Sequence, residues 1–266
     1  MSKPSTAQKP TLAELRAVVH PEGVKDRRSG EHWAGRLYMR EISLRCDPYL
    51  VNTRITPNQL TYLMVVAGIA AGAVLLVPGL VGALVAALLI QLYLLLDCVD
   101  GEVARWRGQT SITGVYLDRV GHYLAEAALL VGFGLRAADL VGTDGEGNWL
   151  WAFLGTLAAL GAILIKAETD LVDVARSRSG LAAVRDEAAV PRSSGLALAR
   201  RAAAALKFHR LVGGVEASLF ILLVAIADLV RGDLFFTRLG VVLLAAIALL
   251  QTLLHLVSIL ASSRLK

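Results

Sequence analysis

Three aspartates close to the end of a hydrophobic segment are the residues best placed to do chemistry. A largely apolar run from Leu80 to Leu96 is followed directly by an acidic stretch that begins with Asp97. Ionisable groups at the edge of a membrane helix are costly, so they indicate a functional site. On a helix, one face would carry residues at i, i+3, i+4, i+7 and i+8, which are Asp97, Asp100, Gly101, Ala104 and Arg105.

A second polar stripe follows shortly afterwards. Gly114, Asp118 and His122 recur at steps of four residues, which places them on one side of the next predicted helix. Carboxylates that converge in a medium of low dielectric constant repel each other unless a cation lies between them. Carboxylate oxygens are hard ligands, so the spacing predicts a Mg²⁺ or Mn²⁺ site. Its expected ligands are the three carboxylates of Asp97, Asp100 and Asp118.

The ordered pattern Asp-x2-Asp-Gly-x2-Ala-Arg-x8-Gly-x3-Asp-x3 resembles the signature of the CDP-alcohol phosphotransferase family, also called CDP-alcohol phosphatidyltransferases. The matching positions are Asp97, Asp100, Gly101, Ala104, Arg105, Gly114 and Asp118. The upstream stretch Thr56–Thr61 also resembles the start of the first span in that family. Together the resemblance covers roughly residues 35–126.

The resemblance implies a reaction and a role for each matching residue. In this family an alcohol hydroxyl attacks the β-phosphorus of a CDP-alcohol, and CMP leaves. The aspartates bind two divalent cations that hold the diphosphate, and small residues accommodate the cytidine nucleotide. By that likeness, the catalytic residues are His122, Asp118 and Arg105. The nucleotide-binding residues are Asn58, Asp100, Gly101, Ala104, Arg105 and Gly114.

His122 departs from the family pattern, in which a fourth aspartate ligates metal and acts as general base. Three interpretations follow. The imidazole can serve as base or as a ligand of Mn²⁺ or another transition metal. Alternatively, the second metal site is weakened or lost and the protein is slow or inactive. Finally, Glu126, four residues further along the same stripe, can supply the missing carboxylate.

The substrates are less well defined than the reaction. We expect CDP-diacylglycerol as donor, because a basic stretch at about 176–213 suits a phosphorylated acceptor alcohol. The alternative is a CDP-polar alcohol such as CDP-inositol with an acceptor of the inositol-phosphate type, since Asp-Gly-Glu-Val-Ala-Arg has some similarity to that branch. Lys166 and Glu168 can meet an acceptor phosphate or each other. Functions of other classes are a catalytically silent homologue and a metal or proton carrier.

The composition predicts the elements that position these residues. Of the 266 residues, 56% are hydrophobic and 18% charged, and the mean hydropathy is +0.60, which favours an all-α polytopic membrane protein. The expected transmembrane helices span residues 58–77, 80–104, 114–135, 149–175, 214–231 and 237–260. They form a catalytic domain over residues 56–266, preceded by a polar arm over residues 1–55.

The arm and the loops predict the orientation. Residues 32–49 mix aromatic side chains with arginines, which is typical of an interfacial amphipathic helix, and a second short one is possible at 196–206. Arginines in the arm and in 176–213 place the N-terminus and the active site in the cytoplasm of a bacterial or archaeal cell, at its plasma membrane. The net charge of +5 therefore indicates lipid partners and no nucleic acid. Gly68 and Gly72 offer a close-packing face, and the family resemblance suggests a homodimer.

Overall fold

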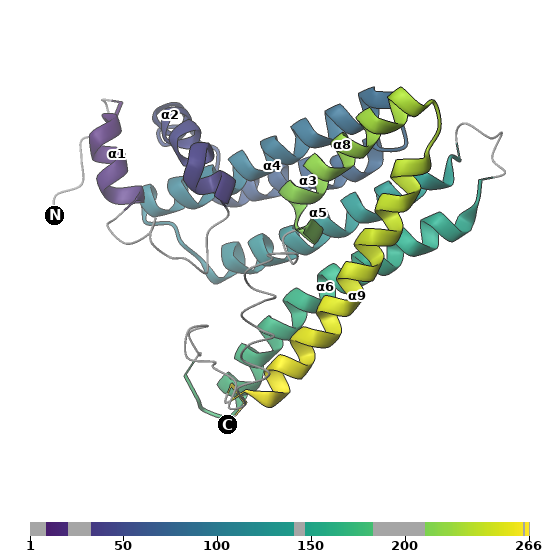
Figure 1. Ribbon diagram of the computed structural model, residues 1–266. Coiled ribbons are helices and arrows are strands. Elements are labelled where there is room, and N and C mark those ends of the chain that lie inside the picture. Colours follow the sequence, from purple (N-terminus) through teal and green to yellow (C-terminus); the bar gives the residue numbers. More distant parts are fainter. Residues whose placement is uncertain (1–8, 21–32, 141–146, 183–210, 263, 266) are drawn as a thin grey trace. The chain divides into compact units, whose positions relative to one another are not determined.

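The computed structural model describes residues 9–20, 33–140, 147–182, 211–262 and 264–265, and within these ranges every regular element is a helix (Figure 1). The predicted all-α class is therefore confirmed. The helices are α1 (Leu12–Val19), η1 (Gly35–Met39), α2 (Arg40–Leu50), α3 (Pro57–Val74), α4 (Gly79–Arg107), α5 (Ile112–Ala138), α6 (Trp149–Arg178), α8 (Gly214–Arg231) and α9 (Phe235–Ala261). Most of the basic stretch at 176–213, and the helix expected at 196–206, lie outside the described residues.

The N-terminal arm contains one helix that we did not predict. Helix α1 starts with a capping box, in which Thr11 accepts a hydrogen bond from the Glu14 amide and Glu14 accepts one from the Thr11 amide. Helix α2 continues η1, a π-helical turn, and together they cover the stretch expected to be amphipathic. The helix expected at 32–49 therefore exists, whereas its position at a membrane surface stays a prediction.

Local signals fix the helix boundaries. Thr56 and Gln59 form a second capping box before α3, with Pro57 in the first turn, where its missing amide hydrogen costs nothing. Helix α6 begins at the cap Asn148, and α8 ends at Gly232 with a left-handed φ of 84°.

Among the residues that the structure describes, four helices are long and apolar enough to cross a membrane, namely α3, α4, α6 and α9. Helix α4, with 29 residues, is about 43 Å long. Many of the large apolar side chains on α9 are exposed, as expected of a helix that faces lipid. Helices α5 and α8 coincide with the two other predicted spans, and their crossing the membrane stays a prediction. Helix α8 is apolar overall but carries three charged residues, Glu216, Asp228 and Arg231, within its 18 residues.

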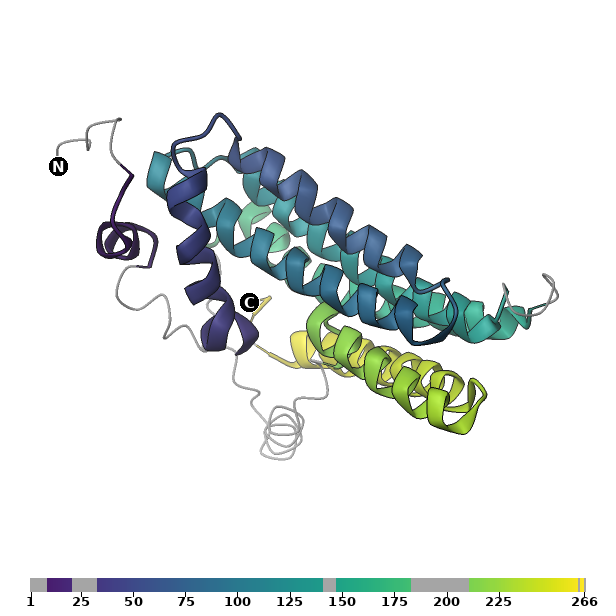
Figure 2. The ribbon, with the colours of Figure 1, turned by 90° about the horizontal axis from the view of Figure 1, so that it is seen from above.

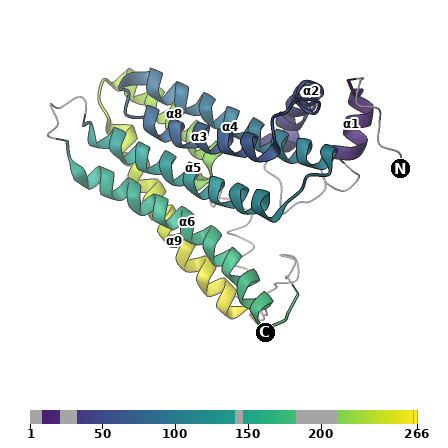
Figure 3. The same ribbon diagram turned by 180° about the vertical axis from the view of Figure 1, so that it is seen from behind.

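The chain divides into two compact units. The first, the N-terminal unit, contains residues 1–67 and 91–122, and the second, the C-terminal unit, contains residues 68–90 and 123–266. In the C-terminal unit, α6 and α9 lie side by side (Figures 1 and 3), and α8 lies beside α9 (Figure 2). Thr252 donates a hydrogen bond across to the Gly161 carbonyl at 3.1 Å, and Gly161 also lies against Ala248. Small residues thus bring these two helices close together.

Glycines also join α5 to its neighbours in the C-terminal unit. A Cβ added to Gly72 of α3 would lie 2.1 Å from the Ala128 carbonyl oxygen of α5. On the other side of α5, a Cβ on Gly134 would lie 2.7 Å from the Cα of Gly155 in α6. Gly72 therefore provides the close packing expected of it, against α5 of its own chain, and the homodimer stays a prediction.

Replacing Gly72 with Leu should prevent close packing of α3 on α5. Overpacking a dense contact typically costs about 1–3 kcal/mol, and backbone atoms cannot move aside as side-chain ends do. We expect a lower melting temperature and a lower yield of monodisperse protein in detergent. Ala73→Leu, at an exposed neighbouring position, is the matched control and should melt like the unmodified protein. Equal melting temperatures for both variants would contradict the packing.

Candidate metal and nucleotide site

Two helices of the N-terminal unit gather the acidic residues. Asp97 comes from α4, while Asp118 and His122 lie one turn apart on α5. The His122 Nε2 is 3.3 Å from Asp97 Oδ1 and 3.5 Å from Asp118 Oδ1. One ligand atom from each of these residues lies within 4.8 Å of the others. The three side chains are partly accessible, so the group can be reached by a ligand.

Tyr93 orients His122. Its hydroxyl makes a short hydrogen bond with His122 Nδ1, and its ring meets the imidazole edge-on. This contact turns Nε2 towards the two carboxylates, as an outer partner does for many metal-binding histidines. We did not predict Tyr93, although its place four residues before Asp97 puts it on the same helical stripe and could have indicated it.

Asp100, an expected metal ligand, has a different immediate partner. The Thr61 hydroxyl of α3 donates a hydrogen bond of 2.5 Å to Asp100 Oδ2, and Asp100 is only 8% exposed. Thr61 belongs to the stretch that opens α3, and this contact gives that stretch a physical role: it holds the second aspartate of the signature in place.

The small residues of the signature make room for polar groups. A Cβ on Gly101 would lie 3.1 Å from Nη1 of Arg105, so the guanidinium of Arg105 lies over the glycine. A Cβ on Gly114 would lie 3.3 Å from the Asn58 side-chain oxygen. Ser111 accepts a hydrogen bond from the Gly114 amide and so caps the start of α5. Ala104 lies on α4 between Gly101 and Arg105 and is partly exposed.

Arg107, at the end of α4, has a structural role that we did not predict. Its guanidinium donates hydrogen bonds to four carbonyl oxygens of the α2–α3 connection, at 2.6 to 3.0 Å, from Leu50, Val51, Thr53 and Ile55. An arginine that satisfies the last carbonyls of one helix from the end of another has no local sequence signature.

The N-terminal unit also contains a buried cluster of ionisable residues next to the signature residues of α4. Glu102 is fully buried and contacts His20 Nε2 at 2.6 Å and Arg40 Nη1 at 3.3 Å. Asp47 is also fully buried, and neither of its carboxylate oxygens has a hydrogen-bond partner. Burial, with the nearby charge of Glu102 as a second cause, raises the pKa of Asp47 to about 8.

Two further polar contacts belong to the C-terminal unit. Lys166 pairs with Glu126 at 2.9 Å, and Glu126 also accepts a hydrogen bond from the Gly214 amide at 3.3 Å. Tyr123 donates a hydrogen bond to Asp170 at 2.5 Å. The ion pair that the structure shows for Lys166 is thus with Glu126 and not with Glu168, and a contact of Lys166 with an acceptor phosphate stays a prediction.

The donor set fits a divalent cation. Two carboxylates and one imidazole, each able to offer one atom within a small sphere, are ligands that suit Mn²⁺ and other transition metals better than Mg²⁺. The identity of the metal stays a prediction.

These features define a class: a helical protein with membrane-length helices, in which two acids and a histidine near the end of one such helix could hold a metal ion. A family model described as CDP-alcohol phosphatidyltransferase matches residues 54–260. The chain therefore belongs to the CDP-alcohol phosphatidyltransferase family, as the signature predicted.

Two curated relatives carry the same name, bifunctional IPC transferase and DIPP synthase. The protein from Thermococcus kodakarensis is 30% identical over 142 residues, which are 53% of this chain and 30% of the relative. The protein from Aquifex aeolicus is 37% identical over 91 residues, which are 34% of this chain and 20% of the relative. The chain thus aligns with less than a third of each relative's length.

Proposed function

We propose that this protein is a membrane transferase that moves a substituted phosphate group from a CDP-alcohol to an acceptor alcohol and releases CMP. The observation that carries the proposal is the convergence of Asp97, Asp118 and His122 within one ligand sphere, at the positions where the family signature has its acids. Family membership alone is compatible with a silent homologue. A silent homologue would not need to keep this donor geometry.

The residues of the site can divide the work as follows. Asp97, Asp118 and His122 would hold a divalent cation, which when bound neutralises diphosphate charge and stabilises the leaving CMP. Arg105 adds a fixed guanidinium for a phosphate oxygen. Since Tyr93 occupies Nδ1, His122 has only Nε2 for either role. It ligates the cation there, or, where the aspartates hold the cation without it, Nε2 takes the proton of the incoming hydroxyl, because a neutral imidazole is a good base near neutral pH.

Contacts of His122 and Glu126 bear on the three interpretations of the missing aspartate. His122 Nε2 faces both carboxylates, whereas Glu126 is engaged by Lys166 and by the Gly214 amide. These contacts favour His122 itself as the fourth corner of the site. Thr61 positions Asp100 as a further ligand or as a contact of the nucleotide.

For the donor, we favour a CDP-polar alcohol of the CDP-inositol type. The two relatives are named bifunctional IPC transferase and DIPP synthase, and the Asp-Gly-Glu-Val-Ala-Arg segment has some similarity to the branch that acts on inositol phosphates. The expectation of CDP-diacylglycerol depended on the basic stretch at 176–213, most of which is not described. The cytoplasmic orientation and the homodimer are parts of the same proposal, supported by the arginine distribution and by the family.

The test is CMP release by the purified full-length protein in detergent with Mn²⁺. One arm offers CDP-inositol with inositol phosphate, and the other offers CDP-diacylglycerol with the same acceptor. Metal-dependent CMP release in the first arm alone supports the proposal, and release in the second arm alone transfers it to the phosphatidyl donor. No CMP release in either arm, from protein that binds Mn²⁺, would favour a silent homologue.

Replacing His122 with Asp should change the preference of the site for metals. A third carboxylate in place of the imidazole makes the donor set harder, so Mg²⁺ should support CMP release nearly as well as Mn²⁺. For the unmodified protein we expect at least about 10-fold more activity with Mn²⁺ than with Mg²⁺, since one ligand accounts for changes of that order. His255→Asp, a partly buried histidine of α9, is the control. An unchanged ratio of the two activities would show that His122 does not touch the metal.

A further inference from the structure

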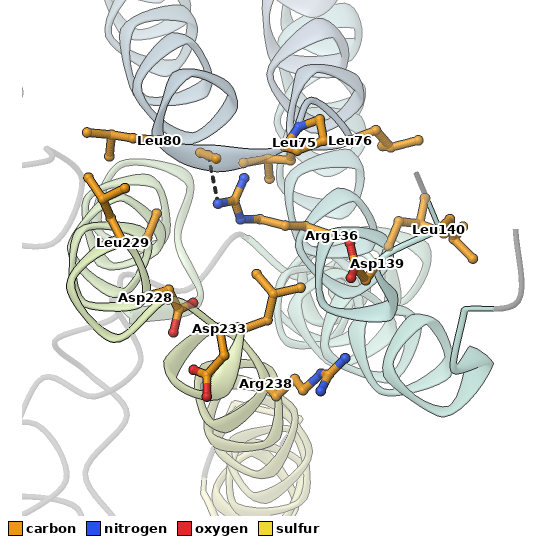
Figure 4. A pocket seen from close by; sticks show the side chains of 16 residues that line it. Leu75, Leu76, Leu80, Arg136, Asp139, Leu140, Asp228, Leu229, Asp233 and Arg238 are labelled. Atoms are coloured by element: carbon orange, nitrogen blue, oxygen red, sulfur yellow. Dashed lines mark hydrogen bonds between the residues drawn. The ribbon is translucent and has the colours of Figure 1, made fainter. Parts of the chain in front are cut away.

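A pocket lies in the C-terminal unit, and none of its lining residues belongs to the signature. Its volume is about 440 Å³, within the range of sites that hold small ligands. The connection between α3 and α4 forms one wall, and the ends of α5 and α8 with the start of α9 form the others (Figure 4). Much of its lining is apolar, with Leu75, Leu76, Leu80, Leu140, Leu229 and Leu234.

Two arginines line this pocket, and the hydrogen bonds of their guanidinium groups go to backbone carbonyls. Arg136 is 7% exposed and donates hydrogen bonds to the Val77 and Gly79 carbonyls at 3.3 and 2.8 Å, while its Nε has no partner. Arg238 donates one to the Ala137 carbonyl at 3.2 Å. Within the described part of the chain, neither guanidinium forms an ion pair. Their charges interact at longer range with aspartates, Arg136 with Asp228 and Asp139 and Arg238 with Asp233, and Arg238 also lies over the Trp151 ring. Because their hydrogen bonds go to neutral carbonyl oxygens, both guanidinium groups can still donate to a phosphate.

Aspartates also line this pocket, and two of them have partners outside the pocket lining. Asp228 accepts hydrogen bonds from the Phe236 and Thr237 amides at 2.7 and 2.9 Å and so caps α9. Asp233 pairs with Arg231, which is not part of the lining. These carboxylates, together with Asp139, give the pocket negative as well as positive groups, as the labelled side chains in Figure 4 show. A purely anionic ligand would be repelled by them, whereas a ligand with both signs matches them.

The position of the pocket at the ends of candidate membrane spans indicates a lipid ligand. Helices α4 and α9 are candidate membrane spans, and they begin at Gly79 and Phe235, beside the pocket lining. The ends of spans lie where the hydrocarbon meets the headgroups. A lipid at this depth would place its headgroup among charged residues and its first methylenes against leucines.

We propose that this pocket binds a zwitterionic phospholipid, with its phosphate at Arg136 and Arg238 and its ammonium at the aspartates. The charge pattern, the apolar wall and the position at the ends of two spans all support the same ligand. The proposal does not depend on the transferase activity, because none of these residues belongs to the signature.

The experiment is native mass spectrometry of the full-length protein in detergent, titrated separately with phosphatidylethanolamine, phosphatidylglycerol and inorganic phosphate. We expect phosphatidylethanolamine to bind at least 10-fold more tightly than phosphatidylglycerol. In Arg238→Gln, which removes one charged donor, its apparent Kd should rise at least 10-fold. Leu229→Trp, which fills the pocket from an exposed position, should weaken binding in the same way.

Arg231→Gln is the matched control, since Arg231 ends the same helix but does not line the pocket. It should bind phosphatidylethanolamine like the unmodified protein. Equal binding of phosphatidylglycerol would overturn the choice of a zwitterion. Competition by inorganic phosphate at equal concentration would show that a free phosphate, and no lipid, is the ligand. Unchanged binding in both pocket variants would exclude the pocket altogether.

Discussion

Replacing Asp97 with Asn is expected to lower CMP release by about 10²- to 10³-fold, the range found when one group that stabilises developing charge is removed. The amide keeps the shape of the side chain and loses the charge that a divalent cation needs. Asp118→Asn should have an effect of the same size, because both carboxylates lie within the same ligand sphere. The assay is CMP release under saturating donor and Mn²⁺.

Asp173→Asn, an exposed acid near the end of α6, is the control and should retain full activity. Chelation with EDTA should abolish release by the unmodified protein, and added Mn²⁺ should restore it. More than a tenth of the original activity in both Asp97→Asn and Asp118→Asn would mean that these acids do not hold the metal.

Replacing Asp47 with Asn is expected to stabilise the protein, increasingly so as the pH rises. The folded protein holds the pKa of Asp47 near 8, whereas the ordinary value of 3.8 applies to the unfolded chain. Between these values the folded state keeps a proton that the unfolded state has lost, so stability falls as the pH rises from about 4 to about 8. Each pKa unit corresponds to about 1.36 kcal/mol, so the gain from pH 5 to pH 8 is at most on the order of 4 kcal/mol.

The measurement is the melting temperature of both proteins in detergent at pH 5 and at pH 8. The advantage of Asp47→Asn should be small at pH 5 and large at pH 8, because an amide carries no charge into the buried cluster. Asp173→Asn controls for a general effect of removing an acid, and should show no such difference. A constant advantage at both pH values would mean that Asp47 is ionised in the folded protein.

The long helices could be predicted from the sequence because their signals are local. Continuous apolar runs, Pro57 at the start of α3 and Asn148 before α6 set boundaries that differ from the expected ones by no more than three residues. Helix α1 was not predicted, although Thr11 and Glu14 have the spacing of a capping box, which indicates the start of a helix. Apolar runs of membrane length do not indicate a helix of eight residues.

For the candidate site, the sequence predicts which residues share one face of a helix, but it does not predict which residues of different helices contact each other. The steps of four residues placed Asp118 and His122 on one stripe, and the structure brings them to Asp97. Contacts such as Thr61 with Asp100, or His20 with Glu102, join residues 39 and 82 positions apart. Tertiary packing decides such pairs, and no spacing rule on one chain indicates them.

The four hydrogen bonds of Arg107 have a mechanical consequence. They fasten the end of α4, the helix that carries Asp97 and Asp100, to the short connection between α2 and α3. These hydrogen bonds hold the connection against the end of α4. A change in the tilt of α2 would therefore be transmitted to the end of α4, the helix that carries Asp97 and Asp100.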